Sequence, residues 1–265
     1  MKKKNVLVIH RGYPLGVEAG DKIRTLNMVE SLRRMGYNVV LLGFFTRGFS
    51  FLKEERKTLP KGLKSILLYS LPNRMRLAKL AEFIRAIETF VISKLYSIDV
   101  IQAELSASAP CARFVTDIPL ITDFHSDLVP ELEMGGYSQD VIEHAASENR
   151  FALKHSDRII SVSDKLFENL QVYGKMNANH FILPCNFNAE PFMGLNLDVR
   201  NRLRAEYGIS DRIVLCYSGA FRVWQCIKET LEVVIRLREL NPSYYLCIFT
   251  NDDTTPFMDL LKQLE

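Results

Sequence analysis

The sequence predicts an α/β fold, a doubly wound parallel sheet followed by an incomplete second unit of the same kind. Short apolar runs of strand-like composition alternate along the chain with segments that have apolar residues at helical spacing. Each run is almost entirely apolar, as expected for strands that helices cover on both faces. The alternation restarts after an interruption near Leu195, which indicates a second unit.

In the first unit the strongest apolar runs predict strands at 6–9, 39–42, 100–103, 120–122 and 158–162. A helix is expected at 25–35, where Leu26, Val29 and Leu32 share one face, and a long helix at 76–95. In the second unit, "RIVLCYSGAF" and "YYLCIFT" predict strands around a helix at 228–240, and "TPFMDLLKQLE" begins another helix.

A complete doubly wound domain has about five or more strands, and the second unit has only two predicted ones. We therefore expect a first domain at residues 1–190 and a truncated second domain at 191–265.

Composition narrows the functional classes. The 265 residues are 48% hydrophobic and 25% charged, as in an ordinary soluble protein, and the net charge of +3 argues against a dedicated nucleic-acid binder. Five scattered cysteines include no CxxC pair, which indicates reduced thiols and a cytoplasmic location. No run is long enough to span a membrane, and no cluster of metal ligands is evident.

A glycine-rich loop follows the first predicted strand. The spacing of Gly12, Gly16 and Gly20 matches neither the dinucleotide fingerprint nor the P-loop. Such a loop can bring backbone N–H groups close to a polar ligand at the carboxyl end of a strand. A plain strand-to-helix connection is the alternative, and both interpretations are open at this point.

Polar residues also follow two later strands. His125 comes just after the strand at 120–122, with Asp123 and Asp127 beside it, and either faces a ligand or has a structural role. Ser163 and Asp164 follow the strand at 158–162 and either contact a ligand or cap the next helix. We expect His125 and the loop from Gly12 to Gly20 to line one cleft, because the carboxyl ends of parallel strands share one edge of a sheet.

In this order, the segments resemble the retaining GT-B glycosyltransferases of the group 1 or family 4 type, which have two Rossmann-like domains. The matching segments are "YPLGVEAGDKIR", "LRRMGYNVVLL", "IDVIQAE", "ITDFHSD", "HSDRIISVSDKLFENL", "ILPCNFNAEPF" and "VLCYSGAFRVWQCIKETLEVV". The resemblance covers nearly the whole chain. It implies an N-terminal domain that holds the acceptor and a C-terminal domain that holds the nucleotide-sugar donor.

The resemblance implies that His125 is the catalytic residue, which hydrogen-bonds a sugar hydroxyl or stabilises charge on the reacting ring. It further implies contacts of the donor or acceptor with Gly16, Gly20, Arg24, Ser163, Gly219, Arg222 and Lys228. It implies no metal and no cofactor, since the nucleotide sugar is a substrate. The implied reaction is hexosyl transfer with retention, by front-face attack, to a glycan or lipid-linked acceptor in cell-surface polysaccharide or glycolipid assembly.

Two departures from the family pattern matter. Ala220 follows Gly219 where the family usually has arginine, and Trp224, which we interpret as core rather than a stacking platform, lies where a Lys-Gly pair is usual. The acidic pair that holds the donor would lie beyond Glu265. A non-catalytic module that binds an acceptor or partner is therefore the alternative to an enzyme. An epimerase of the same architecture or a dinucleotide oxidoreductase fits less well.

Positive charge is concentrated in one segment. Residues 47–94 contain eleven Lys and Arg but four Glu, a surplus of seven in a chain whose net charge is +3. The long helix in this segment has an apolar stripe at helical spacing: Leu77, Leu80, Ala81, Ile84, Ile87 and Val91. Either this helix packs on the core with its cations in solvent, or the segment rests on an anionic membrane surface at the inner face of the membrane.

Overall fold

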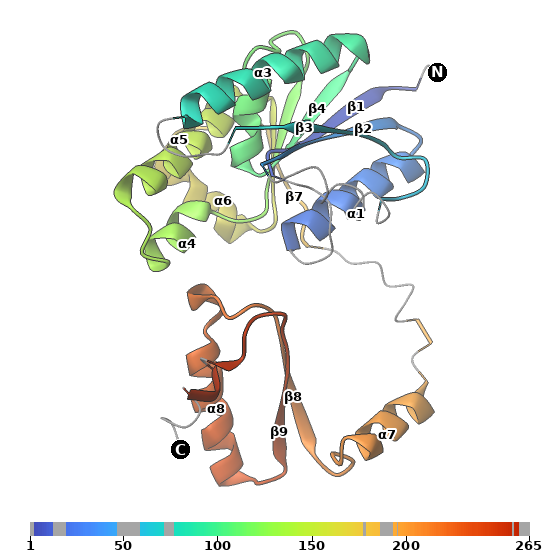
Figure 1. Ribbon diagram of the computed structural model, residues 1–265, viewed down its shortest axis with the longest axis vertical. Helices are drawn as coiled ribbons and strands as arrows, with labels where there is room; N and C mark the ends of the chain where they lie inside the picture. Colours follow the sequence, from blue (N-terminus) through green and yellow to red (C-terminus); the bar gives the residue numbers. More distant parts are fainter. Residues whose placement is uncertain are drawn as a thin grey trace. The chain divides into compact units, whose positions relative to one another are not determined.

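The computed structural model of the chain describes residues 3–12, 20–46, 59–71, 77–176, 179–185, 193–194, 196–255 and 257–259. It divides into two compact units, Met1–Asn188 and Ala189–Glu265. Each unit has a β-sheet of its own, so the two are described separately (Figure 1).

The first unit is built on a seven-stranded sheet in the order β3-β2-β1-β4-β5-β6-β7, and all neighbouring strands are parallel. The strands are β1 (Asn5–His10), β2 (Asn38–Phe45), β3 (Lys64–Tyr69), β4 (Val100–Glu104), β5 (Leu120–Phe124), β6 (Arg158–Ser161) and β7 (Asn179–Ile182). The predicted doubly wound parallel sheet is confirmed. The edge strands β3 and β7 were not predicted, and both are partly exposed rather than buried on two faces.

Helices cover both faces of this sheet (Figure 1). Val8 of β1 packs with Val29 on one face, whereas its neighbour Ile9 shares a cluster with Ile92 and Leu153 on the other. The two clusters follow from the alternation of side chains along a strand. The helical elements of this unit are α1 (Gly20–Arg34), α3 (Ala78–Leu95), η2 (Ser106–Ala112), α4 (Leu128–Met134), α5 (Gln139–His155), α6 (Asp164–Leu170) and η3 (Gln171–Tyr173).

Helix α3 packs on the unit through small and polar side chains and through Ile92. Its buried residues are Ala81, Arg85, Ala86, Thr89, Ile92 and Ser93. Within the predicted apolar stripe, Ala81 is buried, but Leu80, Ile87 and Val91 are exposed. The interpretation that this stripe packs on the core is therefore wrong for its large side chains, because Arg85, Ala86, Thr89, Ile92 and Ser93, which lie outside the stripe, make most of that contact. Over the described residues, no helix is long and apolar enough to cross a bilayer.

The second unit contains a two-stranded parallel sheet formed by β8 (Ile213–Ser218) and β9 (Tyr244–Phe249). Its helical elements are α7 (Leu197–Glu206), η5 (Val223–Gln225) and α8 (Ile227–Leu240). Leu231 and Val234 of α8 are buried. Trp224 is 37% exposed, so its interpretation as a core residue is wrong.

The burial of the central strands predicts how a substitution in β4 changes the free energy of unfolding. Ile101 of β4 has no exposed surface, and we expect Ile101→Ala to lower the free energy of unfolding by about 3 kcal/mol, through lost burial and the cavity left behind. Urea denaturation followed by circular dichroism measures this change. Val172→Ala is the control, since Val172 is 79% exposed; its effect should stay within about 0.5 kcal/mol. Equal effects of the two substitutions would contradict the assignment of β4 to the core.

Candidate active site

A cluster of buried polar side chains lies at the carboxyl edge of the central strands. The strand order reverses between β1 and β4, the point at which open α/β sheets bind their ligands. His10 at the end of β1 is in register with Glu104 at the end of β4, and Glu104 is in register with Asp123 of β5. His125 follows β5 directly. These four side chains therefore meet at one edge because the strands that carry them are adjacent and parallel.

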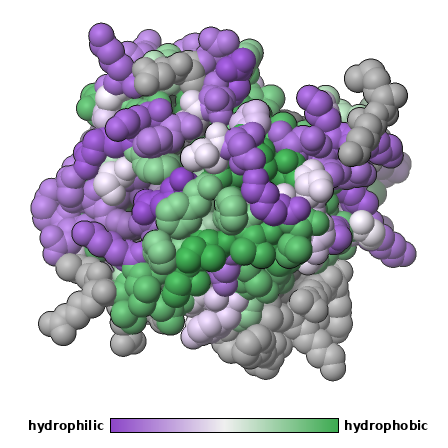
Figure 2. All heavy atoms as spheres, turned by 90° about the horizontal axis from the view of Figure 1, so that it is seen from above, coloured by the Kyte–Doolittle hydropathy of each residue, from purple (hydrophilic) through white to green (hydrophobic). Residues whose placement is uncertain are grey.

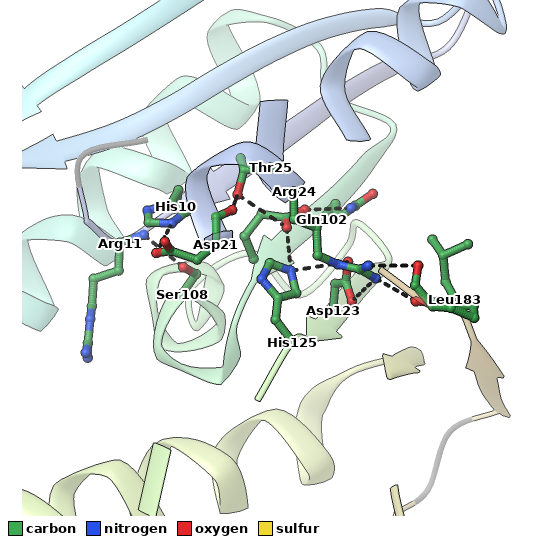
Figure 3. A network of polar contacts seen from close by, with 12 residues as sticks. His10, Arg11, Asp21, Arg24, Thr25, Gln102, Ser108, Asp123, His125 and Leu183 are labelled. Carbon is green, nitrogen blue, oxygen red and sulfur yellow. Dashed lines mark hydrogen bonds and ion pairs between the residues drawn. The ribbon is translucent and has the colours of Figure 1, made fainter. Parts of the chain in front are cut away.

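Arg24 of α1 connects this edge to the end of β7 (Figure 3). Its Nε and Nη2 donate to the two carboxylate oxygens of Asp123, each at 3.1 Å. Nη2 and Nη1 also donate to the carbonyl oxygens of Leu183 and Pro184, at 2.9 and 3.2 Å. The side chains of Arg24 and Asp123 are 6% and 0% exposed. Arg24 thus directs its donors into the protein and positions Asp123 and the segment after β7.

His125 lies against both buried carboxylates. Its Nε2 is 2.9 Å from Oε2 of Glu104 and 3.4 Å from Oδ2 of Asp123. These are charge–charge contacts rather than hydrogen bonds of standard geometry, and Nδ1 has no hydrogen-bond partner among the described residues. The His125 side chain is 8% exposed. One ring nitrogen is therefore held by the protein, whereas the other keeps its capacity to donate.

The charge state of His125 follows from two opposing effects. Burial lowers the pKa of the imidazole, but the contacts with Asp123 and Glu104 outweigh burial and raise the pKa to about 9. His125 is therefore an imidazolium at neutral pH. Together with Arg24, it balances the two negative charges of Glu104 and Asp123.

Glu104 is oriented by further polar contacts. Nε2 of Gln102 donates to its Oε1 at 2.7 Å, and Oγ1 of Thr25 lies 3.5 Å from its Oε2. Glu104, Asp123 and His125 each offer a potential metal-ligand atom, and these atoms lie within 4.8 Å of one another. A divalent cation would have to displace the proton of His125 and compete with the guanidinium of Arg24. We therefore interpret the cluster as an internally neutralised network.

A second histidine–carboxylate pair adjoins the network. Nε2 of His10 is 3.2 Å from Oδ2 of Asp21 in the first turn of α1, and this hydrogen bond holds the pKa of Asp21 below its usual range. A Cβ on Gly12 would lie 3.3 Å from the His10 ring, so glycine leaves room for this histidine. The Nδ1 atom of His10 is buried and has no hydrogen-bond partner in the described part of the chain.

The backbone after β4 is strained. Leu105, which follows Glu104, has φ of 64° and ψ of 154°, a conformation that side-chain-bearing residues rarely adopt. Its N–H donates to the carbonyl of Asp123 at 2.9 Å, which holds the chain in this conformation. Strain of this kind costs about 1–3 kcal/mol and concentrates at functional sites. It supports the assignment of this edge as the active site.

The sequence-predicted site residues have different surroundings. Ser163 caps α6, accepting a hydrogen bond from the N–H of Leu166 at 3.1 Å, and Asp127 caps α4. Gly20 is the first residue of α1, and Gly16 lies outside the described residues. The shared cleft of His125 and the glycine loop thus stays a prediction.

The other predicted donor-binding residues, Gly219, Arg222 and Lys228, belong to the second unit, where Arg222 and Lys228 are exposed.

Three residues of the site were not predicted: His10, Asp21 and Glu104. His10 and Glu104 each occupy the last position of a strand whose preceding residues are mostly apolar. A polar residue at the end of an apolar strand run was the sequence feature that could have identified both as site residues. Asp21 gave no such signal, because an acidic residue in the first turn of a helix is common for electrostatic reasons alone.

The sequence of the first unit matches a known protein family. The model of Glycosyltransferase Family 4 matches residues 20–185, more than half of the chain, so the chain belongs to this family. The matched range includes Arg24, Glu104, Asp123 and His125. A search of curated proteins finds no match to this sequence.

Solved structures of GT-B glycosyltransferases share the fold. Sucrose-phosphate synthase from Thermosynechococcus elongatus is similar with a TM-score of 0.70 and 16% identity, over 99% of this chain and 68% of that one. WaaG, a glycosyltransferase involved in lipopolysaccharide biosynthesis, has a TM-score of 0.67 and 14% identity, over 98% and 67%. Anabaena HepE in complex with UDP has a TM-score of 0.58 and 14% identity, over 94% and 70%. The chain thus spans about two thirds of the length of these proteins.

The geometry predicts how His125 titrates. We expect a pKa of about 9 for His125, measured by NMR of the imidazole nitrogens and assigned with His125→Gln. Glu104→Gln should lower this pKa by about one unit or more, because it removes the negative charge nearest Nε2. Glu143→Gln is the control, since the Glu143 side chain is 62% exposed, and should leave it unchanged. A His125 pKa near 6.5 in the unsubstituted chain would contradict the network.

The raised pKa of His125 predicts that the stability of the folded chain depends on pH. Because the folded-state pKa is above the unfolded one, the contribution of His125 is fully present below about pH 6.5 and is lost as pH rises through about 9. The unfolding free energy of the unsubstituted chain should therefore fall over this interval. Urea denaturation at several pH values should show a smaller fall for His125→Gln.

Proposed function

We propose that this protein transfers a hexose from a nucleotide-sugar donor to a glycan or lipid-linked acceptor in cell-surface polysaccharide or glycolipid assembly. Membership of Glycosyltransferase Family 4 supports the transferase class. The nucleotide-sugar donor is supported by the UDP bound to the similar HepE structure, and the cell-surface role by the involvement of the similar WaaG in lipopolysaccharide biosynthesis. The chain spans about two thirds of the length of these relatives.

The observation that carries the proposal is the position of His125 at the carboxyl edge of the sheet, where its Nε2 contacts two buried carboxylates and its Nδ1 lacks a partner among the described residues. We propose that Nδ1–H donates to a hydroxyl of the donor sugar. A cation would not stabilise the positive charge that develops on the reacting ring, so hydrogen bonding is the role that the charge of His125 favours. Glu104 and Asp123 hold the imidazolium in place.

We further propose that the reaction retains the configuration of the sugar by front-face attack. The acceptor hydroxyl oxygen bonds to the anomeric carbon as the bond to the donor phosphate breaks, and the hydroxyl proton passes to the leaving phosphate oxygen. The two buried carboxylates support this proposal over a covalent sugar–enzyme intermediate. Both oxygens of Asp123 accept from Arg24, and Glu104 accepts from Gln102 and contacts His125.

The alternative is a module that binds an acceptor or a partner without catalysis. Ala220 favours this alternative, because it follows Gly219 where the resemblance implies an arginine for the donor diphosphate. On either view we propose a cytoplasmic protein, peripheral at the inner face of the membrane when its acceptor is carried on a lipid.

Donor binding tests the proposal. We expect titration calorimetry with UDP-glucose and GDP-mannose to give weak binding to this chain for one of them, with slow or no transfer. His125→Gln should weaken binding of that nucleotide sugar about tenfold, the effect of one lost charged hydrogen bond, and leave binding of the free nucleotide unchanged. His155→Gln is the matched control, since His155 is exposed.

Equal weakening for the free nucleotide would contradict the role of His125 at the sugar. If no nucleotide or nucleotide sugar binds this chain or a longer natural form, the binding-module alternative holds instead. Robust transfer by the 265-residue chain would show that its second unit suffices for the donor.

A further inference from the structure

A polar groove lies at the amino edge of the seven-stranded sheet, opposite to the edge that carries His125. Its described lining includes Asn5, Asn38 and Lys64, the first residues of β1, β2 and β3, and Tyr96, which ends α3. The exposed apolar side chains of α3, where Figure 2 shows an apolar band, lie outside this lining. The groove has a volume of about 580 Å³, and pockets for small molecules have ~300–1,000 Å³.

The groove has an excess of positive charge. Among its described lining residues, Arg33, Arg34 and Lys64 are cations, and Glu30 is the one carboxylate. Arg33 is occupied, because its Nη1 donates to Glu30 at 3.0 Å and its Nη2 donates to the carbonyl of Lys61 at 2.9 Å. One carboxylate thus balances one of the cations, and the remaining positive charge attracts an anionic ligand.

The other two cations have donors left for such a ligand. In the described part of the chain no carboxylate pairs with Lys64, whose ammonium lies 3.9 Å from the centre of the Tyr96 ring. The contact of Arg34 with Glu30 involves only its Nε, at 3.7 Å, and the Arg34 side chain is 64% exposed. Arg34 and Lys64 therefore offer charged donors from two different elements, α1 and β3.

Asn5 holds one wall of the groove in place. Its Nδ2 donates to the carbonyls of Tyr96 and Ser97 at 3.1 and 3.0 Å, and its Oδ1 accepts from Nδ2 of Asn38 at 3.0 Å. Its N–H donates to Oδ2 of Asp99 at 2.7 Å, so this nearby carboxylate is engaged. The contact with Asn5 also holds Ser97 at a φ of 46°, a left-handed conformation that residues with side chains rarely adopt. A wall that is ordered before binding loses little conformational entropy when a ligand arrives.

The floor of the groove is apolar. Val39 and Val40 of β2 line it and are buried. Tyr37, a further lining residue, packs against the apolar cluster that contains Val39 and Val29. Charged donors above an apolar floor suit a ligand that has both an anionic group and an organic part.

We propose that this groove binds a small organic phosphate. A phosphate group has more acceptor oxygens than a carboxylate, so it can accept from the guanidinium of Arg34 and the ammonium of Lys64 together. The organic part would cover Tyr37 and Val39. A soluble small molecule fits the volume of the groove, and the net charge of +3 argues against a nucleic acid. The proposal does not depend on transferase activity.

An NMR titration of the full, isotope-labelled chain tests the proposal, with phenyl phosphate and inorganic phosphate as probes at constant ionic strength. We expect phenyl phosphate to shift the amide signals of Asn5, Gly62 and Lys64 with a Kd of about 1 mM or lower, and to leave the signals of His125 unchanged. Inorganic phosphate should bind at least about tenfold more weakly, because it leaves the apolar floor uncovered. The combined variant Arg34→Gln and Lys64→Gln should weaken binding of phenyl phosphate at least about tenfold. Circular dichroism should show an unchanged fold, because both side chains are exposed.

The matched control, Lys154→Gln combined with Lys175→Gln, removes the same charge from two exposed lysines outside the described lining of the groove. It should bind phenyl phosphate as the unsubstituted chain does. The proposal is wrong if the groove amides do not shift, if the control weakens binding as much as the groove variant, or if inorganic phosphate binds as tightly as phenyl phosphate. It is also wrong if the shifts occur at His125 instead. Because the groove and His125 lie at opposite edges of the sheet, neither failure decides the proposed binding of a nucleotide sugar.

Discussion

The pairing of two buried carboxylates with two cations is the interaction on which the site depends. Glu104 and Asp123 have no exposed side-chain surface, and an unpaired buried charge destabilises a protein by several kcal/mol. Arg24 and the protonated His125 neutralise them. Because these groups come from α1, β4 and the end of β5, their pairing also sets how the helix and strands meet. The carbonyls of Leu183 and Pro184 extend the same network to the end of β7.

This arrangement gives the two histidines of the edge different properties. His125 is held by two carboxylates that raise its pKa to about 9, which makes it a permanent donor at neutral pH. His10 contacts one carboxylate, that of Asp21, which is partly exposed. The strained backbone at Leu105 directly follows Glu104, and its N–H donates to the carbonyl of Asp123 on the neighbouring strand. A rigid, internally neutralised edge of this kind can hold a donor group in place before a substrate arrives, which reduces reorganisation during reaction.

Helix α3 exposes large apolar side chains on the surface of the first unit. In α3, polar and small side chains together with Ile92 face the protein, whereas most of the large apolar side chains are exposed, unlike an ordinary surface helix. The inward arginine, Arg85, is accommodated because Ser70 accepts its hydrogen bond.

The sequence by itself determined the five inner strands of the doubly wound sheet and the helices α1 and α3, because an apolar strand run and a helical spacing are local patterns. It also indicated His125, which directly follows a strand. Only the tertiary structure decided what His125 contacts. Arg24 and Asp123 are 99 positions apart, and no local pattern predicts that such residues pair. Nor can a sequence tell whether an apolar helical stripe faces the core, since the stripe at 77–91 has the same period in either orientation. The structure shows that Leu77, Leu80, Ile87 and Val91 of this stripe are exposed, whereas Ala81 is buried.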